Sequence, residues 1–335
     1  MKIRTNAIAL FFLTAMLANQ AHAGEPAGPV AIAIHAGAGS MSRQDLPPEM
    51  DKKMRAMLEQ AVRAGHEVLA SGGSSLDAVS KAVTILEDAP FFNAGRGAVF
   101  NAEGINELDA SIMDGQTLNA GAVAGVHNVR NPVLLARKVM TDSVHVMLAG
   151  EGAEAFAREQ GIEFKDDDYF RTERRWQQLQ KAKAVKTVQA PHKPDYWLST
   201  VGAVALDGQG NLAAATSTGG MTNKRWGRIG DVPVIGAGTY ADNESCAVSA
   251  TGHGEYFIRA TVARDICARI EYTGASLQEA ADQVVMQKLV DMGGRGGIIA
   301  ADPQGNLSLT FNTSGMHRAS MDTEGEIYIG IYNDE

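Results

Sequence analysis

Residues 199–206 read STVGAVAL, and they join two segments of different character. The segment before them, from Lys181 to Pro194, is basic, polar and contains proline, as exposed linkers are. The segment from Val201 to Leu206 is an apolar run of strand length. Thr200 therefore lies where a linker meets a buried strand, and a cut before it would create a new N-terminus at the rim of a core.

An N-terminal threonine can supply both a nucleophile and a base. A free α-amine has a pKa of about 7.7–8.0, so near neutral pH it can accept the proton of its own residue's hydroxyl. Position alone favours a simpler interpretation, in which Thr200 only begins a β-strand. The polar groups that follow favour chemistry, because amide hydrolysis needs such groups. They are Thr216-Ser217-Thr218-Gly219-Gly220, Arg228-Ile229-Gly230-Asp231 and Thr251-Gly252-His253-Gly254-Glu255.

Common catalytic and cofactor motifs do not occur in the sequence. There is no GxSxG, no P-loop, no HExxH and no CxxC pair, so neither a serine-hydrolase elbow nor a nucleotide or zinc site is indicated. Residues 236–241 fit a GxGxxA spelling, but Asp242 and Asn243 follow where a dinucleotide site needs the start of a helix. We interpret this segment as a turn.

The N-terminal segment predicts export. Lys2 and Arg4 precede an apolar run at residues 7–17, and Ala21-His22-Ala23 has the small-x-small pattern of a cleavage site. The run is too short to span a membrane. We expect residues 1–23 to be a signal peptide and the mature protein to be periplasmic or secreted. The net charge of −9, with acidic and basic residues interspersed, argues against a nucleic-acid partner.

The chain contains two cysteines, Cys246 and Cys267. An exported protein can form a disulfide, but a chain of this size does not depend on one for stability. The sequence therefore favours two buried thiols, with a single bridge as the alternative.

Strand and helix patterns occur in blocks. Helices are expected at residues 54–69, 75–86, 132–140, 152–160, 170–184, 256–272 and 277–292. Strands are expected at residues 30–34, 108–113, 201–206, 212–217, 232–235, 245–250, 297–301, 307–311 and 327–331. Ser75 is expected to cap its helix, and a glycine turn is expected at residues 35–39. Residues 207–212 and 302–307 share the pattern DxQGNL and predict two similar hairpins.

These blocks indicate an α+β fold. Two sheets would pack face to face with helices outside, in a four-layer αββα order. A doubly wound α/β fold stays open as the alternative.

Many short sequence motifs occur in a fixed order along the chain. They include His35-x-Gly37-Ala38-Gly39, Phe92-Asn93-Ala94-Gly95, Glu107-Leu108-Asp109-Ala110, Asn119-Ala120-Gly121-Ala122-Val123-Ala124-Gly125, Thr200-Val201-Gly202, Ser217-Thr218-Gly219-Gly220, Gly227-Arg228-x-Gly230-Asp231, Gly236-Ala237-Gly238 and Phe311-Asn312-Thr313. In these motifs the chain resembles the plant-type L-asparaginases and isoaspartyl peptidases, a family of N-terminal-nucleophile hydrolases. The resemblance spans nearly the whole mature chain.

The resemblance implies an αββα fold and a precursor that cleaves itself between Ser199 and Thr200. The products would be an α subunit of residues 24–199, ending in a flexible linker at about 181–199, and a β subunit of residues 200–335. Together they would form one domain. The family usually has glycine where Ser199 stands, which leaves the rate of self-cleavage open.

The resemblance also implies the catalytic roles. Thr200 would be the nucleophile, and Thr218 would lie beside its amine and hydroxyl. The Thr251 hydroxyl and the Gly252 N–H would form the oxyanion hole, in which such donors stabilise the transition state by about 3–4 kcal/mol each.

Four further residues would bind the substrate by the same resemblance. Arg228 would hold the α-carboxylate through its two-pronged fork, and Asp231 and the Gly254 carbonyl would receive the α-ammonium. Asn93 would help the first subunit to line the site. The implied substrates are β-aspartyl (isoaspartyl) dipeptides and L-asparagine.

The resemblance implies no required cofactor and a dimer of αβ units. It also implies a loop that binds sodium through backbone carbonyls, although a plain helix-terminating loop fits the sequence equally well. The carbonyls would be those of Leu86, Glu87, Ala89, Phe92, Ala94 and Arg96.

Three alternatives stay open for the residues of the site. One is a glycosylasparaginase-like hydrolase, which accepts sugar-bearing asparagine. The second comes from another class, an exported binding protein for acidic amino acids that would use Arg228 and Asp231 for capture without turnover. The third is a surface ion pair between Arg228 and Asp231.

Overall fold

The structure of the protein is a computed structural model that describes residues 28–44, 46–184 and 200–335. The expected signal peptide lies outside the described residues. So do Ser199 and the part of the expected linker that follows Ala184.

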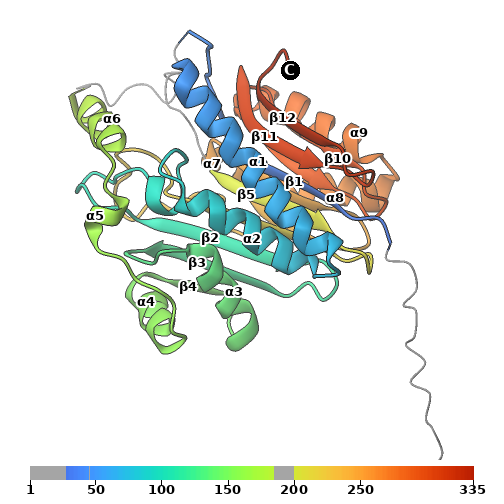
Figure 1. The fold of residues 1–335 in the computed structure, drawn as a ribbon, viewed down its shortest axis with the longest axis horizontal. Helices are drawn as coiled ribbons and strands as arrows, with labels where there is room; N and C mark the ends of the chain where they lie inside the picture. The colour runs from blue at the N-terminus through green and yellow to red at the C-terminus, as the bar shows by residue number, and fades with distance from the viewer. Residues whose placement is uncertain (1–27, 45, 185–199) are drawn as a thin grey trace, which may run out of the picture.

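Two β-sheets pack face to face, and helices cover their outer faces (Figure 1). The larger sheet has the strand order β12-β11-β1-β5-β6-β2-β3-β4, and the smaller has the order β10-β9-β8-β7. The larger sheet contains β1 (Ala31–Gly39), β2 (Leu108–Asp114), β3 (Ala120–Val126), β4 (Met147–Ala149), β5 (Val201–Leu206), β6 (Leu212–Thr218), β11 (Gly315–Met321) and β12 (Ile327–Tyr332). The smaller contains β7 (Thr239–Ala241), β8 (Ala247–Gly252), β9 (Gly296–Ala301) and β10 (Leu307–Ser308).

The described strands pair antiparallel, except that β3 pairs parallel to β4. The predicted αββα sandwich is confirmed, and a doubly wound parallel sheet is excluded.

Each sheet has its own helical layer. On the larger sheet lie α1 (Pro48–Ala70), α2 (Ser75–Asp88) and α3 (Pro132–Asp142), of which α1 and α2 cross the near face in Figure 1. On the smaller sheet lie α7 (Gly254–Ala260), α8 (Val262–Thr273), α9 (Leu277–Asp282), the π-helical turn η2 (Gln283–Lys288) and α10 (Leu289–Asp291). The connection from β4 to residue 184 contains α4 (Gly150–Glu159), α5 (Asp167–Phe170) and α6 (Glu173–Ala184).

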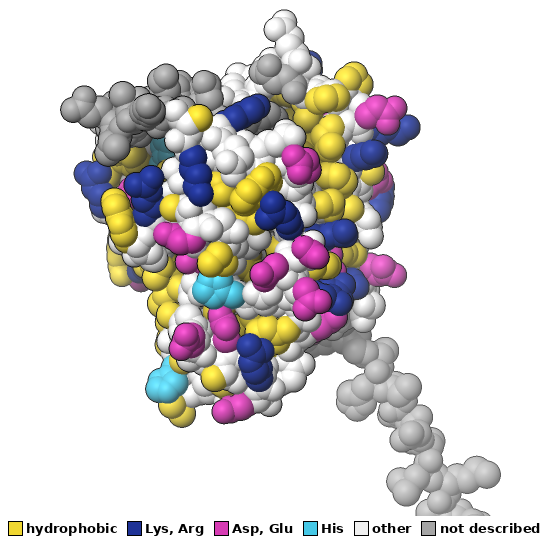
Figure 2. All heavy atoms as spheres, turned by 90° about the vertical axis from the view of Figure 1, so that its left-hand side faces the viewer, with side chains coloured by type: hydrophobic (Ala, Val, Ile, Leu, Met, Phe, Trp, Pro, Cys, Tyr) yellow, Lys and Arg dark blue, Asp and Glu magenta, His cyan; other side chains and the backbone are white. Residues whose placement is uncertain are grey.

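The surface carries charges of both signs. The face shown in Figure 2 carries both Lys and Arg side chains and Asp and Glu side chains, with neither sign covering the whole face. Among the described residues, no helix is both long and apolar enough to cross a membrane.

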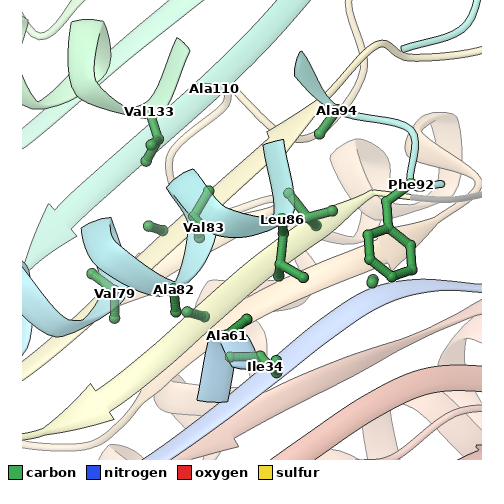
Figure 3. Close-up of a cluster of buried hydrophobic side chains, with 14 of the residues drawn as sticks. Ile34, Ala61, Val79, Ala82, Val83, Leu86, Phe92, Ala94, Ala110 and Val133 are labelled. Atoms are coloured by element: carbon green, nitrogen blue, oxygen red, sulfur yellow. The ribbon is translucent and has the colours of Figure 1, made fainter. Parts of the chain in front are cut away.

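Three apolar layers form the core. One lies between α1–α3 and the larger sheet, where Leu86, Val83 and Ile34 are buried together (Figure 3). A second lies between the smaller sheet and α7–α10. The third lies between the two sheets and is rich in alanine, so the sheets can approach closely.

The alternation along β5 explains why its sequence is apolar throughout. Val201, Ala203 and Ala205 face the helices, whereas Val204 and Leu206 face the second sheet. Because β5 is buried on both faces, packing holds the start of this strand in place. Thr200 directly precedes the strand and is positioned by it.

The two cysteines form a disulfide, so the prediction of two thiols was wrong. Cys246 precedes β8, Cys267 lies in α8, and both are fully buried with their Cα atoms 5.3 Å apart. Only the packing of α8 on β8 brings them together, and the sequence pattern does not show that packing. For a sequence separation of 21 residues, such a crosslink stabilises the fold by about 3 kcal/mol.

The two predicted hairpins are confirmed, and their shared pattern has a physical cause. The Asp207 carboxylate accepts hydrogen bonds from the N–H groups of Gln209 and Asn211 at 3.0 and 2.9 Å. The Asp302 carboxylate holds its own turn through Gln304 and Asn306 at the same two distances. In each case the aspartate side chain stabilises the turn that joins two strands.

Several predicted strand limits differ from the structure. β1 continues through the expected glycine turn at residues 35–39, with a register shift between His35 and Ala38. Residues 232–235 form a turn instead of a strand, and the strand expected at residues 307–311 ends at Ser308. β3, β4, β7 and β11 were not predicted as strands, and β7 occupies part of residues 236–241, which we interpreted as a turn.

Some helix predictions also need correction. Ser74, one residue before the expected cap, accepts the Asp77 N–H at 3.1 Å and caps α2. The helix expected at residues 256–272 is interrupted at Thr261, whose φ of 48° is left-handed. The helix expected at residues 277–292 contains the π-helical turn.

Candidate active site

Thr200 lies at the N-terminal end of β5, near the middle of the larger sheet. It is 8% exposed, and its Oγ1 donates a hydrogen bond to Thr218 Oγ1 at 3.1 Å. Thr218 ends β6, the strand next to β5, and its Oγ1 also accepts the Gly220 N–H at 3.0 Å. The structure thus brings the predicted nucleophile and its predicted partner into contact.

Thr251 and Gly252 end β8 of the smaller sheet, and Gly252 lines the pocket that Thr200 also lines. Thr251 Oγ1 accepts the Ala38 N–H at 3.4 Å, so its own hydroxyl proton stays available to donate. A Cβ on Gly252 would lie 2.5 Å from Phe257 Cε2 and 2.6 Å from the Arg295 carbonyl oxygen. Only glycine fits at this position.

One small pocket joins the Thr200 and Thr218 hydroxyls to charged groups. It is lined by Thr200, Thr218, Gly220, Met221, Arg228, Gly230, Asp231 and Gly252. Five residues that the sequence analysis named as catalytic or substrate-binding therefore line one pocket, and they are Thr200, Thr218, Arg228, Asp231 and Gly252. A sixth, Thr251, directly precedes Gly252 in the chain.

Arg228 is held on one edge by a carboxylate. Its Nε lies 2.9 Å from Glu255 Oε1, and its Nη2 lies 3.0 Å from Glu255 Oε2. The other edge faces glycines, because a Cβ on Gly230 would lie 2.6 Å from Nη1. The surface ion pair considered for Arg228 therefore has Glu255 as its partner. Sequence reasoning missed Glu255, since nothing local connects it to an arginine at position 228.

Asp231 is buried and has an unsatisfied carboxylate oxygen. It is 5% exposed, and its Oδ2 has no hydrogen-bond partner within the described part of the chain. Burial raises the pKa of Asp231 to about 7, although the nearby Arg228 guanidinium opposes the shift. An ammonium group placed beside this oxygen would satisfy it.

Gly254 lies against both charged groups. A Cβ at this position would be 2.7 Å from Arg228 Nη2 and 2.8 Å from Asp231 Oδ1. Any side chain there would displace one of the two. The pocket thus presents a cation and a buried carboxylate side by side, which complement a carboxylate and an ammonium on one carbon.

His35 is a second residue to which sequence reasoning assigned no role. Its Nδ1 lies 2.9 Å from the Thr200 carbonyl oxygen, and its Nε2 lies 2.9 Å from Ser249 Oγ. Burial lowers the pKa of His35 to about 3, so the ring is neutral and can donate from Nδ1 and accept at Nε2. Hydroxyl contacts of 2.7, 2.6 and 2.7 Å then link Ser249, Thr216, Thr239 and Ser111 between the two sheets. This buried chain fixes the backbone of Thr200.

Asn93 contacts the turn that follows Thr218. Its Nδ2 donates to the Gly220 carbonyl at 2.7 Å, and its Oδ1 accepts the Val99 N–H at 2.9 Å. Asn93 is not among the residues that line the pocket. Its implied role in binding substrate stays a prediction.

The loop predicted to bind sodium turns some carbonyls inward. A Cβ on Gly97 would lie 2.0 Å from the Phe92 oxygen and 3.1 Å from the Ala89 oxygen, so two of the six predicted ligands converge on one point. The Leu86 and Ala94 oxygens accept loop N–H groups from Ala89 and Gly97 at 3.3 and 3.0 Å. No cluster of three or more His, Cys, Asp or Glu side chains suited to a metal ion occurs among the described residues.

The structure has two packed sheets between helical layers. Thr200 lies at the start of a central strand, and Gly252 at the end of β8 in the second sheet lines the same pocket. This arrangement is that of an N-terminal-nucleophile hydrolase fold. A profile of the Asparaginase family matches residues 28–331. The chain belongs to this family of N-terminal-nucleophile hydrolases.

Curated relatives are similar over most of their length. The isoaspartyl peptidase of Escherichia coli (strain K12) is 52% identical over 313 residues, which are 92% of this chain and 98% of that protein. The isoaspartyl peptidase/L-asparaginase of Xenopus laevis is 44% identical over 307 residues, covering 91% and 96% of the two chains. The probable isoaspartyl peptidase/L-asparaginase 2 of Arabidopsis thaliana is 41% identical over 328 residues, covering 91% and 99%.

Proposed function

We propose that this protein is an amidohydrolase that cleaves β-aspartyl dipeptides and the side-chain amide of L-asparagine. The observation that carries the proposal is the shared pocket, in which the Thr200 hydroxyl faces the same space as the Arg228 guanidinium and the Asp231 carboxylate. The names of the relatives, isoaspartyl peptidase and L-asparaginase, support this substrate class.

The active form requires a cut between Ser199 and Thr200, which turns the Thr200 nitrogen into an α-amine. In our proposal this amine takes the proton of the Thr200 hydroxyl while Oγ1 attacks the side-chain carbonyl of the substrate. The amine then gives the proton to the leaving nitrogen, and an ester of Thr200 remains. Water, activated by the same amine, hydrolyses the ester and restores the threonine.

The negative oxygen formed in both steps needs donors. The Thr251 hydroxyl and the Gly252 N–H are the proposed donors, and the Ala38 N–H leaves the Thr251 proton available for this use. Thr218 accepts the Thr200 hydroxyl in the structure and is proposed to orient it before attack.

Substrate orientation follows from the charged end of the pocket. Arg228 would bind the α-carboxylate through its Nη1 edge, and Asp231 with the Gly254 carbonyl would receive the α-ammonium. A β-aspartyl group held in this way presents its side-chain amide to Thr200. In this proposal Asn93 supports the site through the Gly220 carbonyl.

Intact mass spectrometry of the purified mature protein tests the cleavage directly. We expect two fragments, the smaller beginning at Thr200, together with release of free aspartate from a β-aspartyl dipeptide and from L-asparagine. Faster release from glycosylated asparagine would instead support a glycosylasparaginase. An uncut chain that binds aspartate without turnover would support the binding-protein alternative, although one sandwich domain in place of two lobes argues against it.

The pH dependence should report two groups. Because burial raises the pKa of Asp231 to about 7, this residue is neutral below that pH and cannot hold an ammonium. The α-amine of Thr200, with a pKa of about 7.7–8.0, must also be neutral to act as a base. We therefore expect kcat/KM for a β-aspartyl dipeptide to rise with pH, with a limiting slope of about two decades per pH unit below both pKa values. Asp231→Asn should reduce this slope to about one decade per unit; an unchanged slope would show that Asp231 is not the group that titrates.

We further propose the features that the resemblance implied outside the pocket. A signal peptide of residues 1–23 and a periplasmic or secreted location would be checked by N-terminal sequencing of secreted protein. A dimer of αβ units would be checked by light scattering. A sodium ion held by the carbonyls of residues 86–96 would be checked by comparing thermal stability in sodium and choline chloride.

A further inference from the structure

A lysine is buried behind the pocket. Lys224 follows the Gly220 turn, and its side chain is only 1% exposed. Its Nζ lies 3.1 Å from the Glu107 carbonyl oxygen and 3.5 Å from Glu107 Oε2. Burial of an ammonium group costs several kcal/mol unless it is compensated, so the position of Lys224 requires an explanation.

A second buried carboxylate depends on this lysine. Asp109 is fully buried and pairs across β2 and β6 with Thr218. Its Oδ1 accepts the Gly125 N–H at 2.8 Å, whereas its Oδ2 has no hydrogen-bond partner in the described residues. Burial raises the pKa of Asp109, and the charge of Lys224 is foremost among the influences that lower it. One role of Lys224 is therefore to balance the negative charge of the Asp109 carboxylate.

The Lys224 ammonium also lies against the wall of the pocket. Gly220 lines the pocket, and a Cβ on it would be 3.1 Å from Lys224 Nζ and 3.5 Å from Arg228 Nη1. The ammonium and the glycine-facing edge of the guanidinium therefore flank one small space. Because residue 220 has no side chain, a ligand on Arg228 can come close to Lys224.

A carboxylate bound in this space requires a second positive charge besides that of Arg228. The Asp231 carboxylate lines the pocket, and Glu255 already occupies the Nε and Nη2 edge of Arg228. A substrate carboxylate that approaches Nη1 meets the negative charge of ionised Asp231 and of Glu255, and the charge of Asp109 acts on Asp231 as well. With Arg228 alone, attraction would be weak, and Lys224 restores it from behind Gly220.

We propose that Lys224 is a positioning residue for the α-carboxylate of the substrate, acting through its charge beside Arg228. This inference rests on the proposed function of the pocket as a site for an α-amino acid. It does not require the ammonium to hold the loop, because the Ala102 N–H donates to the Lys224 carbonyl at 2.9 Å and fixes the backbone independently.

The test compares two ligands that differ in one charge. L-aspartate carries the α-carboxylate, and its α-amide, isoasparagine, has nearly the same shape without that charge. Lys224→Met keeps the length of the side chain and removes its charge. We expect it to weaken L-aspartate binding, measured by calorimetry, and to raise KM for a β-aspartyl dipeptide about tenfold, with kcat changed less than about threefold and isoasparagine binding unchanged.

A charge-matched background separates recognition from neutralisation of Asp109. The effect of Lys224→Met is measured again in the D109N variant. In this background no buried carboxylate at position 109 needs the lysine charge to balance it. The double variant also allows the measurement if Lys224→Met alone does not fold. We expect the same loss of L-aspartate affinity in both backgrounds. Restored affinity in the double variant, or equal losses for the two ligands, would show that Lys224 has only a structural role.

The outcomes also separate this inference from the proposed function. Wild-type protein that hydrolyses the dipeptide, with binding that does not depend on Lys224, would overturn the inference alone. Wild-type protein that binds L-aspartate in a Lys224-dependent manner without hydrolysis would overturn the proposed function alone.

Discussion

Replacing Thr200 by alanine is expected to abolish both self-cleavage and amide hydrolysis while the fold stays intact. The change removes Oγ1, which is the attacking atom in the proposed reaction and the donor to Thr218 at 3.1 Å. Loss of the nucleophile of a serine protease lowers kcat by about 10⁶-fold, and we expect a loss of at least about 10⁴-fold here. The neighbouring Thr218 hydroxyl cannot replace it, because it lies within the chain and has no α-amine of its own.

The fold should survive because the side chain contributes little packing. The neighbouring β5 residues provide the apolar contacts, and the His35 contact is made to the Thr200 carbonyl, which alanine retains. Intact mass, thermal melting and release of aspartate are the measurements. Thr200→Ser, which keeps a hydroxyl, is the matched control and should retain some cleavage and activity. A processed and active alanine variant would be incompatible with the mechanism.

Sequence patterns succeeded where the interactions are local. The end of β5 could be located from an apolar run that is buried on both faces, and the two hairpins from an aspartate that bonds to N–H groups two and four residues later. Each signal arises within a few neighbouring residues.

The pattern failed at β11, although this strand lies inside the larger sheet between β12 and β1. β11 contains His317 and Arg318, which an apolar-run criterion rejects. The Arg318 guanidinium is buried because it donates to the Met316 and Tyr332 carbonyls at 3.0 and 3.2 Å. The Met316 carbonyl is local, but Tyr332 lies in β12 and comes within reach only after β11 and β12 have paired.

The same limit applies to the site. The threonines, Arg228 and Asp231 lie in recognisable sequence motifs, so their part in the site could be predicted. The contacts of Glu255 with Arg228, of Lys224 with Glu107 and of His35 with Thr200 join residues far apart in sequence. His35 and Thr200 lie on the paired strands β1 and β5, and Glu107 and Lys224 flank the paired strands β2 and β6. These contacts form only when distant segments pair, and no spacing along the chain reveals them.

Arg228→Ala is the second change with a large expected effect, and its main effect should be on KM. Each hydrogen bond between charged groups contributes about 1.5–3 kcal/mol, so loss of a two-pronged contact should raise KM for a β-aspartyl dipeptide at least about 100-fold. Removal of the arginine also leaves the Glu255 carboxylate, now 2.9 Å from Nε, without its partner beside the pocket. That carboxylate would repel the substrate carboxylate and add to the loss.

Steady-state kinetics of Arg228→Ala, Arg228→Lys and Glu255→Gln separate these contributions. Lysine keeps the charge without the fork, so it should restore only part of the affinity. Glu255→Gln leaves the guanidinium charged and should change KM far less than Arg228→Ala. Adding Glu255→Gln to Arg228→Ala should lower KM again, because the unpartnered carboxylate is then gone. Unchanged kinetics in Arg228→Ala would show that this arginine has only a structural role. If the double variant has a KM no lower than that of Arg228→Ala, then Glu255 orients the arginine and does not oppose the substrate.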